Sequence, residues 1–153
     1  MAGKYHWAGK LMLLTSLLIS VAGTVFAAQD VKVTLRPSGQ MQIAGRLGDE
    51  RVIATGSVSV TRSSVDDNIV VWLNALQDGG RGGRYIITGK NNENNKLRVK
   101  LKAEDSHSDN NSGGIVFTGN RFTRTFEIVA DGEQKITSDV YPINLQAGIE
   151  TSL

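Results

Sequence analysis

Apolar and polar residues alternate with a period of two through much of this chain. Val31, Val33 and Leu35 alternate with polar neighbours, and the same pattern returns in residues 54–61 and 69–75. Successive side chains of a strand point to opposite faces, so this pattern predicts half-buried β-strands. The helical period of 3.6 residues does not occur in these segments.

The second half of the chain continues the pattern. Residues 84–88 are rich in β-formers, Leu97, Val99 and Leu101 alternate with cations, and Phe122, Phe126 and Ile128 precede an Ala-Asp-Gly break. A polar loop is expected from Glu104 to Gly114. The last strand, Val140 to Ala147, is expected to turn one row toward the core: Tyr141, Ile143, Leu145 and Ala147. Short strands at this spacing, without helices, predict an antiparallel β-sandwich.

The first 27 residues have the pattern of an export signal rather than of a folded element. Lys4 and Lys10 form a basic start, residues 11–21 are mainly apolar, and Val25-Phe26-Ala27 has small residues at the positions before a cleavage site. We expect cleavage before Ala28. The remaining residues 28–153 then have the length of one domain. No later segment has the roughly 20 apolar residues of a membrane span, so we expect this domain to be exported.

Charge and composition narrow the function. The whole chain has 17 Lys and Arg against 15 Asp and Glu; without Lys4 and Lys10 this becomes 15 against 15, so the expected mature domain is neutral and nucleic acid is not an expected partner. The sequence has no cysteine, and only His107 of its two histidines follows the signal. No nucleophile and base pair or metal-ligand cluster can be assembled from the sequence, so we expect no enzymatic activity and no cofactor.

Two features are candidate receptor surfaces. Lys96, Arg98, Lys100 and Lys102 share one face of a predicted strand and could dock an acidic polysaccharide or lipid head groups; the alternative is a solvated edge strand whose lysines prevent aggregation. Trp72 lies in the polar row of its strand, which points it away from the core. A tryptophan on this strand of an immunoglobulin fold is often buried, so both positions remain open.

A series of segments resembles the invasin or tip subunits of the Afa/Dr adhesins and the related Saf-type fimbriae. In chain order they are Ala54-Thr55-Gly56, Val71-Trp72-Leu73-Asn74, Asp78-Gly79, Arg84-Tyr85, Lys96-Leu97-Arg98-Val99, the run from Phe126 to Gly132, and Tyr141. The resemblance spans nearly the whole expected mature chain. The segments Val-Trp-Leu-Asn and Val-Ala-Asp-Gly together are its most specific part.

The resemblance implies an all-β, incomplete immunoglobulin-like sandwich that lacks its last strand and is completed by a donor strand. It also implies a periplasmic chaperone, an outer-membrane usher, a neighbouring fimbrial subunit, a place at the cell surface in a fimbria and a host-cell receptor, for which integrins are the proposed class. Invasins of this family carry a disulfide. The corresponding positions here are Val60 and Ile149, an apolar pair that could replace it by packing.

An incomplete sandwich predicts a groove between the first and last strands, lined by Val31, Val33, Leu35, Tyr141, Ile143 and Leu145. The expected mature chain enters its first strand by Val31 and has little to donate, which favours a tip or minor subunit acting as adhesin or invasin. Two alternatives remain. Val31, Val33 and Leu35 could be the donor strand of a shaft subunit, or the chain could be a self-contained periplasmic binding or inhibitor domain.

Overall fold

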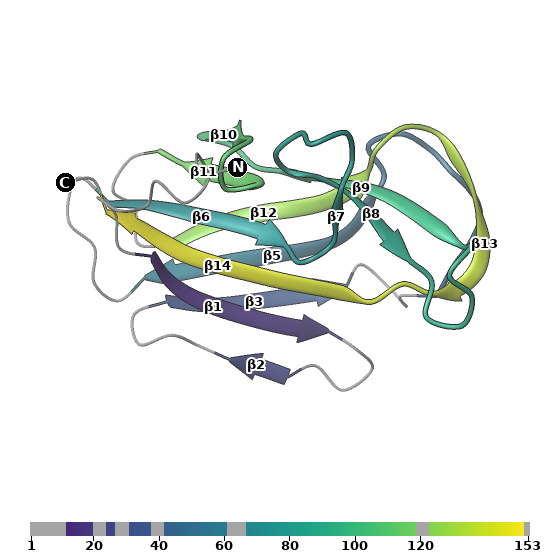
Figure 1. Ribbon diagram of the computed structural model, residues 1–153, viewed down its shortest axis with the longest axis horizontal. Helices are drawn as coiled ribbons and strands as arrows, with labels where there is room; N and C mark the ends of the chain where they lie inside the picture. Colours follow the sequence, from purple (N-terminus) through teal and green to yellow (C-terminus); the bar gives the residue numbers. More distant parts are fainter. Residues whose placement is uncertain are drawn as a thin grey trace.

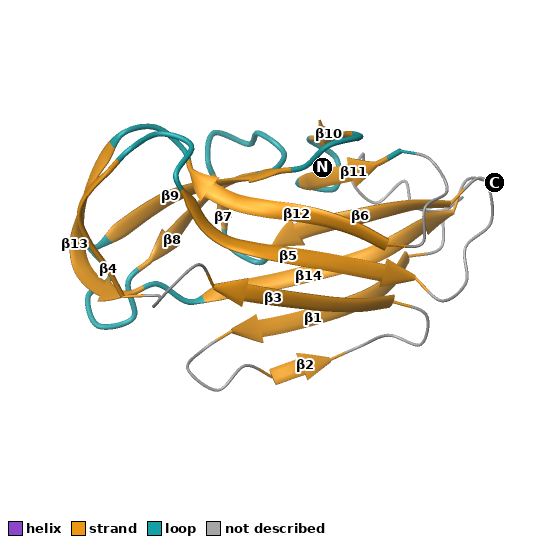
Figure 2. Cartoon of the chain, turned by 180° about the vertical axis from the view of Figure 1, so that it is seen from behind, coloured by secondary structure: helices purple, strands orange, loops and turns teal. Residues whose placement is uncertain are grey.

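The computed structural model describes residues 12–19, 24–26, 31–37, 42–60, 67–118 and 123–151. These residues form β-strands joined by turns, in two packed sheets and one strand pair (Figures 1 and 2). The strands are β1 (Met12–Ile19), β2 (Thr24–Phe26), β3 (Val31–Pro37), β4 (Gln42–Leu47), β5 (Val52–Val60), β6 (Asp67–Leu73), β7 (Leu76–Gln77), β8 (Arg84–Thr88), β9 (Lys96–Lys102), β10 (Ser106–Asp109), β11 (Gly114–Phe117), β12 (Thr123–Ala130), β13 (Gln134–Val140) and β14 (Ile143–Thr151). This part of the chain contains no helix that could cross a membrane.

One sheet has the order β10-β11-β6-β14-β1-β2 and the other has the order β3-β5-β12-β9-β8-β7, with β4 and β13 paired separately. The pairings are antiparallel. The two sheets enclose one core to which both contribute, including Val33, Val58, Leu97, Ile128 and Leu145. The sandwich that the alternation predicts is therefore present.

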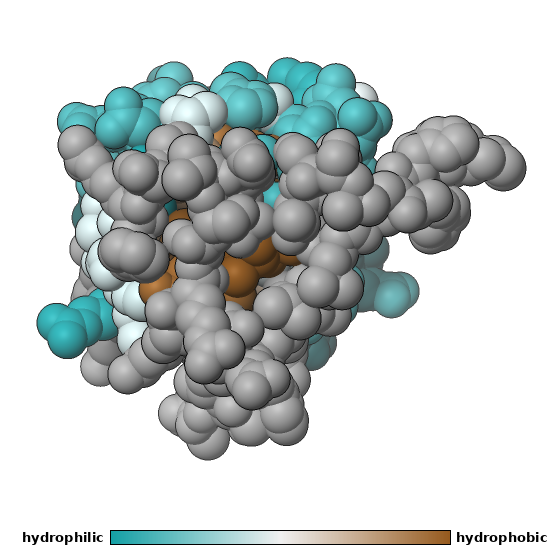
Figure 3. Space-filling view, turned by 90° about the vertical axis from the view of Figure 1, so that its left-hand side faces the viewer, coloured by the Kyte–Doolittle hydropathy of each residue, from teal (hydrophilic) through white to brown (hydrophobic). Residues whose placement is uncertain are grey.

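The core is fitted by local shape as well as by alternation. Phe126 of β12 is opposite Gly56 of β5 in the register and is buried. A Cβ atom added to Gly56 would lie 2.3 Å from the ring atom Cζ of Phe126, so this glycine leaves the space that the ring needs. At the end of the sandwich where β14 finishes, apolar residues are visible near the centre (Figure 3).

Several expected boundaries are wrong. The expected loop from Glu104 to Gly114 contains β10 and the start of β11, whose four residues are all buried. Residues 114–117 pack on both faces, so no alternation marks them. The last strand runs from Ile143 to Thr151 rather than from Val140 to Ala147, since Val140 ends β13. Phe122 and the expected cleavage site before Ala28 lie outside the described residues.

The corner between β13 and β14 is fixed by a buried tyrosine. The Tyr141 hydroxyl donates to the carbonyl of Thr137 at 2.7 Å, and the ring is buried. Burial and the nearby Asp139 carboxylate raise the pKa of this hydroxyl. A tyrosine that bonds back to the backbone a few residues upstream is a feature of immunoglobulin-like sandwiches.

Asp139 joins this corner to the turn between β8 and β9. Its buried carboxylate accepts hydrogen bonds from the backbone N–H groups of Asn91, Asn92 and Val140 and from the side-chain amides of Asn91 and Asn95, at 2.6 to 3.2 Å. Burial opposes ionisation, but the hydrogen bonds from Asn95, Asn91 and Val140 outweigh it and lower the pKa of Asp139 to about 2. The ionised carboxylate thus holds the chain just before β14.

We predict that Asp139→Asn lowers the melting temperature by several degrees. Both carboxylate oxygens accept from N–H groups, and the asparagine NH₂ that replaces one of them would be a donor facing other donors. The wild-type carboxylate has a folded pKa below its ordinary value of 3.8, so its contribution is complete above about pH 4 and is lost as the pH falls toward 2. Melting curves from pH 6 to 2 measure both effects. Glu93→Gln, at an exposed position in the same turn, is the control; equal melting of the two variants would contradict the assignment.

Candidate functional site

The candidate groove lies at the edge of the sandwich where β14 and β3 face each other across the two sheets. Val31 and Val33 of β3 are buried, Leu35 is half-buried against the core, and Ile143 and Leu145 of β14 are buried. Tyr141 is buried as well, but it lies in the corner before β14 rather than on the strand. Five of the six predicted groove residues therefore belong to the two strands that border this edge.

In the full chain, β1 occupies this edge. It pairs antiparallel with β14 along eight residues, from Met12 opposite Glu150 to Ile19 opposite Ile143, and it also lies beside β3 (Figures 1 and 2). The expected export signal is thus partly a strand of this sheet, which the sequence analysis did not anticipate. Cleavage before Ala28 would remove β1 and β2 together.

The β1–β14 register gives the pattern that this edge accepts. Opposite the core-facing row of β14, namely Ile143, Leu145, Ala147 and Ile149, stand Ile19, Leu17, Thr15 and Leu13. Residues directly opposite each other in an antiparallel pair share one face of the sheet. Opposite this row, β1 therefore carries an apolar residue at each position except Thr15, which is opposite Ala147.

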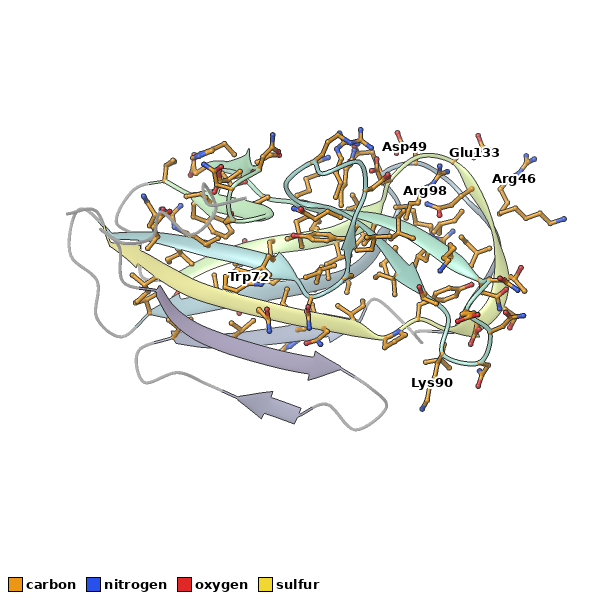
Figure 4. All side chains as sticks on the ribbon, viewed as in Figure 1. Arg46, Asp49, Trp72, Lys90, Arg98 and Glu133 are labelled. Atoms are coloured by element: carbon orange, nitrogen blue, oxygen red, sulfur yellow. The ribbon has the colours of Figure 1, made fainter. Side chains whose placement is uncertain are left out.

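The other long side of β14 pairs with β6, and Trp72 contributes to this pairing. Trp72 is opposite Gln146, and its indole Nε1 donates to Gln146 Oε1 at 2.6 Å. The side chain is half-buried, which lies between the exposed and the buried alternatives that the sequence left open. Trp72, labelled in Figure 4, therefore joins two strands and keeps part of its surface exposed.

The four cations of β9 share one face, as predicted, but β9 is a central strand between β12 and β8. The edge-strand explanation is therefore wrong. It failed because local alternation identifies a strand and its faces but not its neighbours in the sheet. The cations lie on the sheet opposite to that of Trp72, so the two candidate receptor surfaces do not form one site.

Glu50 forms ion pairs with two of the four cations, Lys100 and Lys102. Its carboxylate is 2.5 Å from Lys100 Nζ and 2.8 Å from Lys102 Nζ. Hydrogen bonds from these two lysines lower the pKa of Glu50 to about 2 and raise the pKa of Lys102. Lys96 instead donates to the hydroxyl of Thr88, and the backbone of Arg98 bonds with the Gln134 side chain. Within the described residues, Lys100 and Lys102 thus have an acidic partner, and Lys96 and Arg98 have none.

Val60 and Ile149, the positions that correspond to the family disulfide, are both buried in the core. His107 is exposed on β10. The described residues contain no group of His, Asp and Glu side chains that could hold a metal ion.

The sequence matches the family model of the enterobacterial AfaD invasin protein over residues 43–147. The chain belongs to the AfaD invasin family. The matched residues include β5 to β13 and the core-facing start of β14, so they cover most of both sheets. No curated protein matches the chain.

Solved structures of fimbrial subunits have the same fold. The Hda pilus minor tip subunit HdaB of Escherichia coli is 24% identical with a TM-score of 0.68, covering 77% of this chain and 81% of HdaB. The Salmonella SafD adhesin is 24% identical with a TM-score of 0.69, covering 78% and 83%. AggB, the minor subunit of aggregative adherence fimbriae type I of E. coli, is 22% identical with a TM-score of 0.61, covering 80% and 99%. The fold of this AfaD-family chain is therefore the immunoglobulin-like sandwich of fimbrial subunits.

We predict that the double variant Lys100→Gln, Lys102→Gln restores the pKa of the Glu50 carboxyl from about 2 toward its ordinary 4.5, because it loses both donors. An NMR titration of the Glu50 carboxyl carbon measures this change. Lys90→Gln, at an exposed position outside the row, should leave the titration unchanged. A Glu50 pKa near 2 in the double variant would contradict the pairing.

Proposed function

We propose that this chain is a tip or minor subunit of a chaperone-usher fimbria, completed by a donor strand at the edge between β14 and β3, and that it acts in attachment to host cells. The observation that carries this proposal is the pairing of β1 with β14. A strand from outside the expected mature domain fills the gap along eight residues. Family membership and the similarity to the minor-subunit and adhesin structures described above support the same role.

Cleavage before Ala28 would remove the strand that covers this edge. Without β1, the N–H and C=O groups on one side of β14 lose their partners, and the apolar row from Ile143 to Ile149 loses its cover. Unpaired strand edges and exposed apolar rows are both unfavourable in water and promote aggregation. A strand supplied first by a periplasmic chaperone and then by a neighbouring subunit would satisfy both by β-augmentation.

The tip position is supported by the pairing of β3 within the chain's own sheet. Its seven residues pair with β5, from Val31 opposite Val60 to Pro37 opposite Ala54, and Val31 and Val33 are buried in the chain's own core. A segment that completes its own sheet is not free to complete that of a neighbour. This favours the tip or minor subunit over a shaft subunit that donates Val31, Val33 and Leu35.

We predict that residues 28–153 alone aggregate or melt at low temperature, and that a donor fused after Leu153 stabilises them strongly. The donor is the Met12–Ile19 sequence joined by a short glycine-rich turn, because Met12 stands opposite Glu150 near the end of β14. Thermal unfolding and size-exclusion chromatography compare the two proteins. A monomer that melts cooperatively at the same temperature with and without the donor would favour the self-contained domain.

Two donor variants test the register. One variant has serine in place of Leu13, Leu17 and Ile19 of the donor, the positions opposite Ile149, Leu145 and Ile143. It should lose most of the stabilisation, because burial of each of these apolar side chains contributes roughly 1.5 to 3 kcal/mol to stability. Serine at Met12, Leu14 and Leu18, the alternate row, is the matched control and should cost much less. Equal effects of the two triple variants would contradict the proposed groove.

A further inference from the structure

In the part of the chain that the structure describes, the outer face of the β3-β5-β12-β9-β8-β7 sheet has at least two hollows. The larger, of about 660 Å³, has charged residues of both signs in its lining: Arg36, Lys102, Glu104 and Glu127. It therefore offers no preference for a charged partner. The smaller, of about 490 Å³, is lined by Leu76, Ile86, Lys96, Arg98, Gln134 and Lys135. We call this second feature the β7–β9 hollow; its charged residues are all cations.

The β7–β9 hollow has an apolar centre. Leu76 of β7 is opposite Ile86 of β8, and Ile86 is opposite Arg98 of β9, so these three residues form one row across the outer face. Leu76 is 70% exposed, and it is the one exposed large hydrophobic residue among those whose burial the structure describes. Ile86 beside it is half-buried. An exposed leucine next to a second apolar side chain offers a partner an apolar contact surface.

The charges around this centre are uncompensated. Among the described residues, Lys96, Arg98 and Lys135 form no ion pair, and all three are exposed. Neighbouring cations are paired, since Arg84 lies 2.8 Å from Asp131 and Lys100 and Lys102 bind Glu50. The uncompensated positive charge on β9 is thus concentrated at the apolar centre rather than spread along the strand.

Arg98 is held in place by its neighbours. Gln134 Oε1 accepts from the Arg98 N–H at 2.9 Å, and Gln134 Nε2 donates to the Arg98 carbonyl at 2.9 Å. The Arg98 carbonyl also accepts from the N–H of Asp131 at 3.0 Å. These bonds fix the backbone of β9 beyond its pairing with β12, and they bring the start of β13, with Lys135, to the rim of the hollow. A partner would meet a backbone that is already arranged.

We propose that the β7–β9 hollow is a docking site for an acidic protein segment that inserts an apolar side chain beside Leu76 and Ile86 and places carboxylates near Lys96, Arg98 and Lys135. An acidic polysaccharide would use the cations but has no need of the exposed leucine. Recruitment to an anionic membrane by charge uses clusters of four to eight basic residues, and this site has three. An apolar anchor inside a charged rim is the arrangement of a protein interface.

This inference names a partner chemistry for the proposed attachment role and rests on that role for its biological meaning, but its test does not depend on donor-strand assembly. The full 153-residue chain is titrated into a fluorescein-labelled peptide with two leucines flanked by glutamates, and anisotropy is measured. Peptides with the leucines replaced by serine, or the glutamates by glutamine, should bind much more weakly. Raising the salt from about 0.05 M to about 0.5 M should weaken binding of the parent peptide.

Point variants locate the site. Leu76→Ser and Lys135→Gln should each weaken binding by roughly fivefold to tenfold, as expected for an anchor and for a facing charge. Lys90→Gln removes one positive charge from an exposed turn well apart from Arg98 (Figure 4) and should leave binding unchanged. Circular dichroism checks the fold of each variant. If Leu76→Ser does not fold, Lys135→Gln against Lys90→Gln decides.

Three outcomes would overturn the proposal. The first is no binding of the parent peptide, or binding equally weakened by Lys90→Gln. The second is tighter binding to heparin that is insensitive to Leu76→Ser, which would assign the surface to polyanions. The third is binding to phosphatidylserine vesicles but not to the peptide. Because the full chain retains β1, a failure here is distinct from a failure of donor-strand completion, which is read from the melting of residues 28–153.

Discussion

The need of β14 for a strand on each side is the constraint on which the rest of the molecule depends. Every N–H and C=O of a strand in a packed sheet needs a partner, and β14 meets this requirement with β6 on one side and with β1 on the other. The same strand contributes four residues to the core. Loss of one neighbour therefore affects backbone pairing and apolar burial together, and a replacement strand can restore both at once.

The parts of the chain around β14 hold it ready for such a replacement. The Tyr141 hydroxyl and the Asp139 carboxylate fix the corner from which β14 begins, and Trp72 ties the middle of β14 to β6 through Gln146. A rigid edge loses less conformational entropy when it gains a partner than a flexible one does. These three side chains therefore matter for assembly, although none of them belongs to the residues of β14 that pair with β1.

Local alternation was sufficient to predict much of the sandwich from the sequence, including β3, β8 and β9 close to their observed bounds. It failed at β11, because residues 114–117 are buried on both faces, and at β13, where Ile136 and Asp139 are the buried residues and one of them is charged. The order of strands in a sheet is not a local property, so β9 could not be recognised as central. The pairing of Glu50 with Lys100 and Lys102 was missed for the same reason, since it joins segments far apart in the chain.

The alternation of β14 also limits how a partner strand can be misaligned. A shift by one residue would turn the whole apolar row of the partner toward solvent, so misalignment proceeds in steps of two residues. The registers reached by these steps are not equivalent, because Ala147 is one small side chain in a row with Ile143, Leu145 and Ile149. A partner that carries its own small residue, as β1 carries Thr15 opposite Ala147, can match this sequence of sizes in one alignment only. A shift by two residues would place Thr15 opposite Leu145 or Ile149 instead, so Ala147 distinguishes the described register from the neighbouring ones.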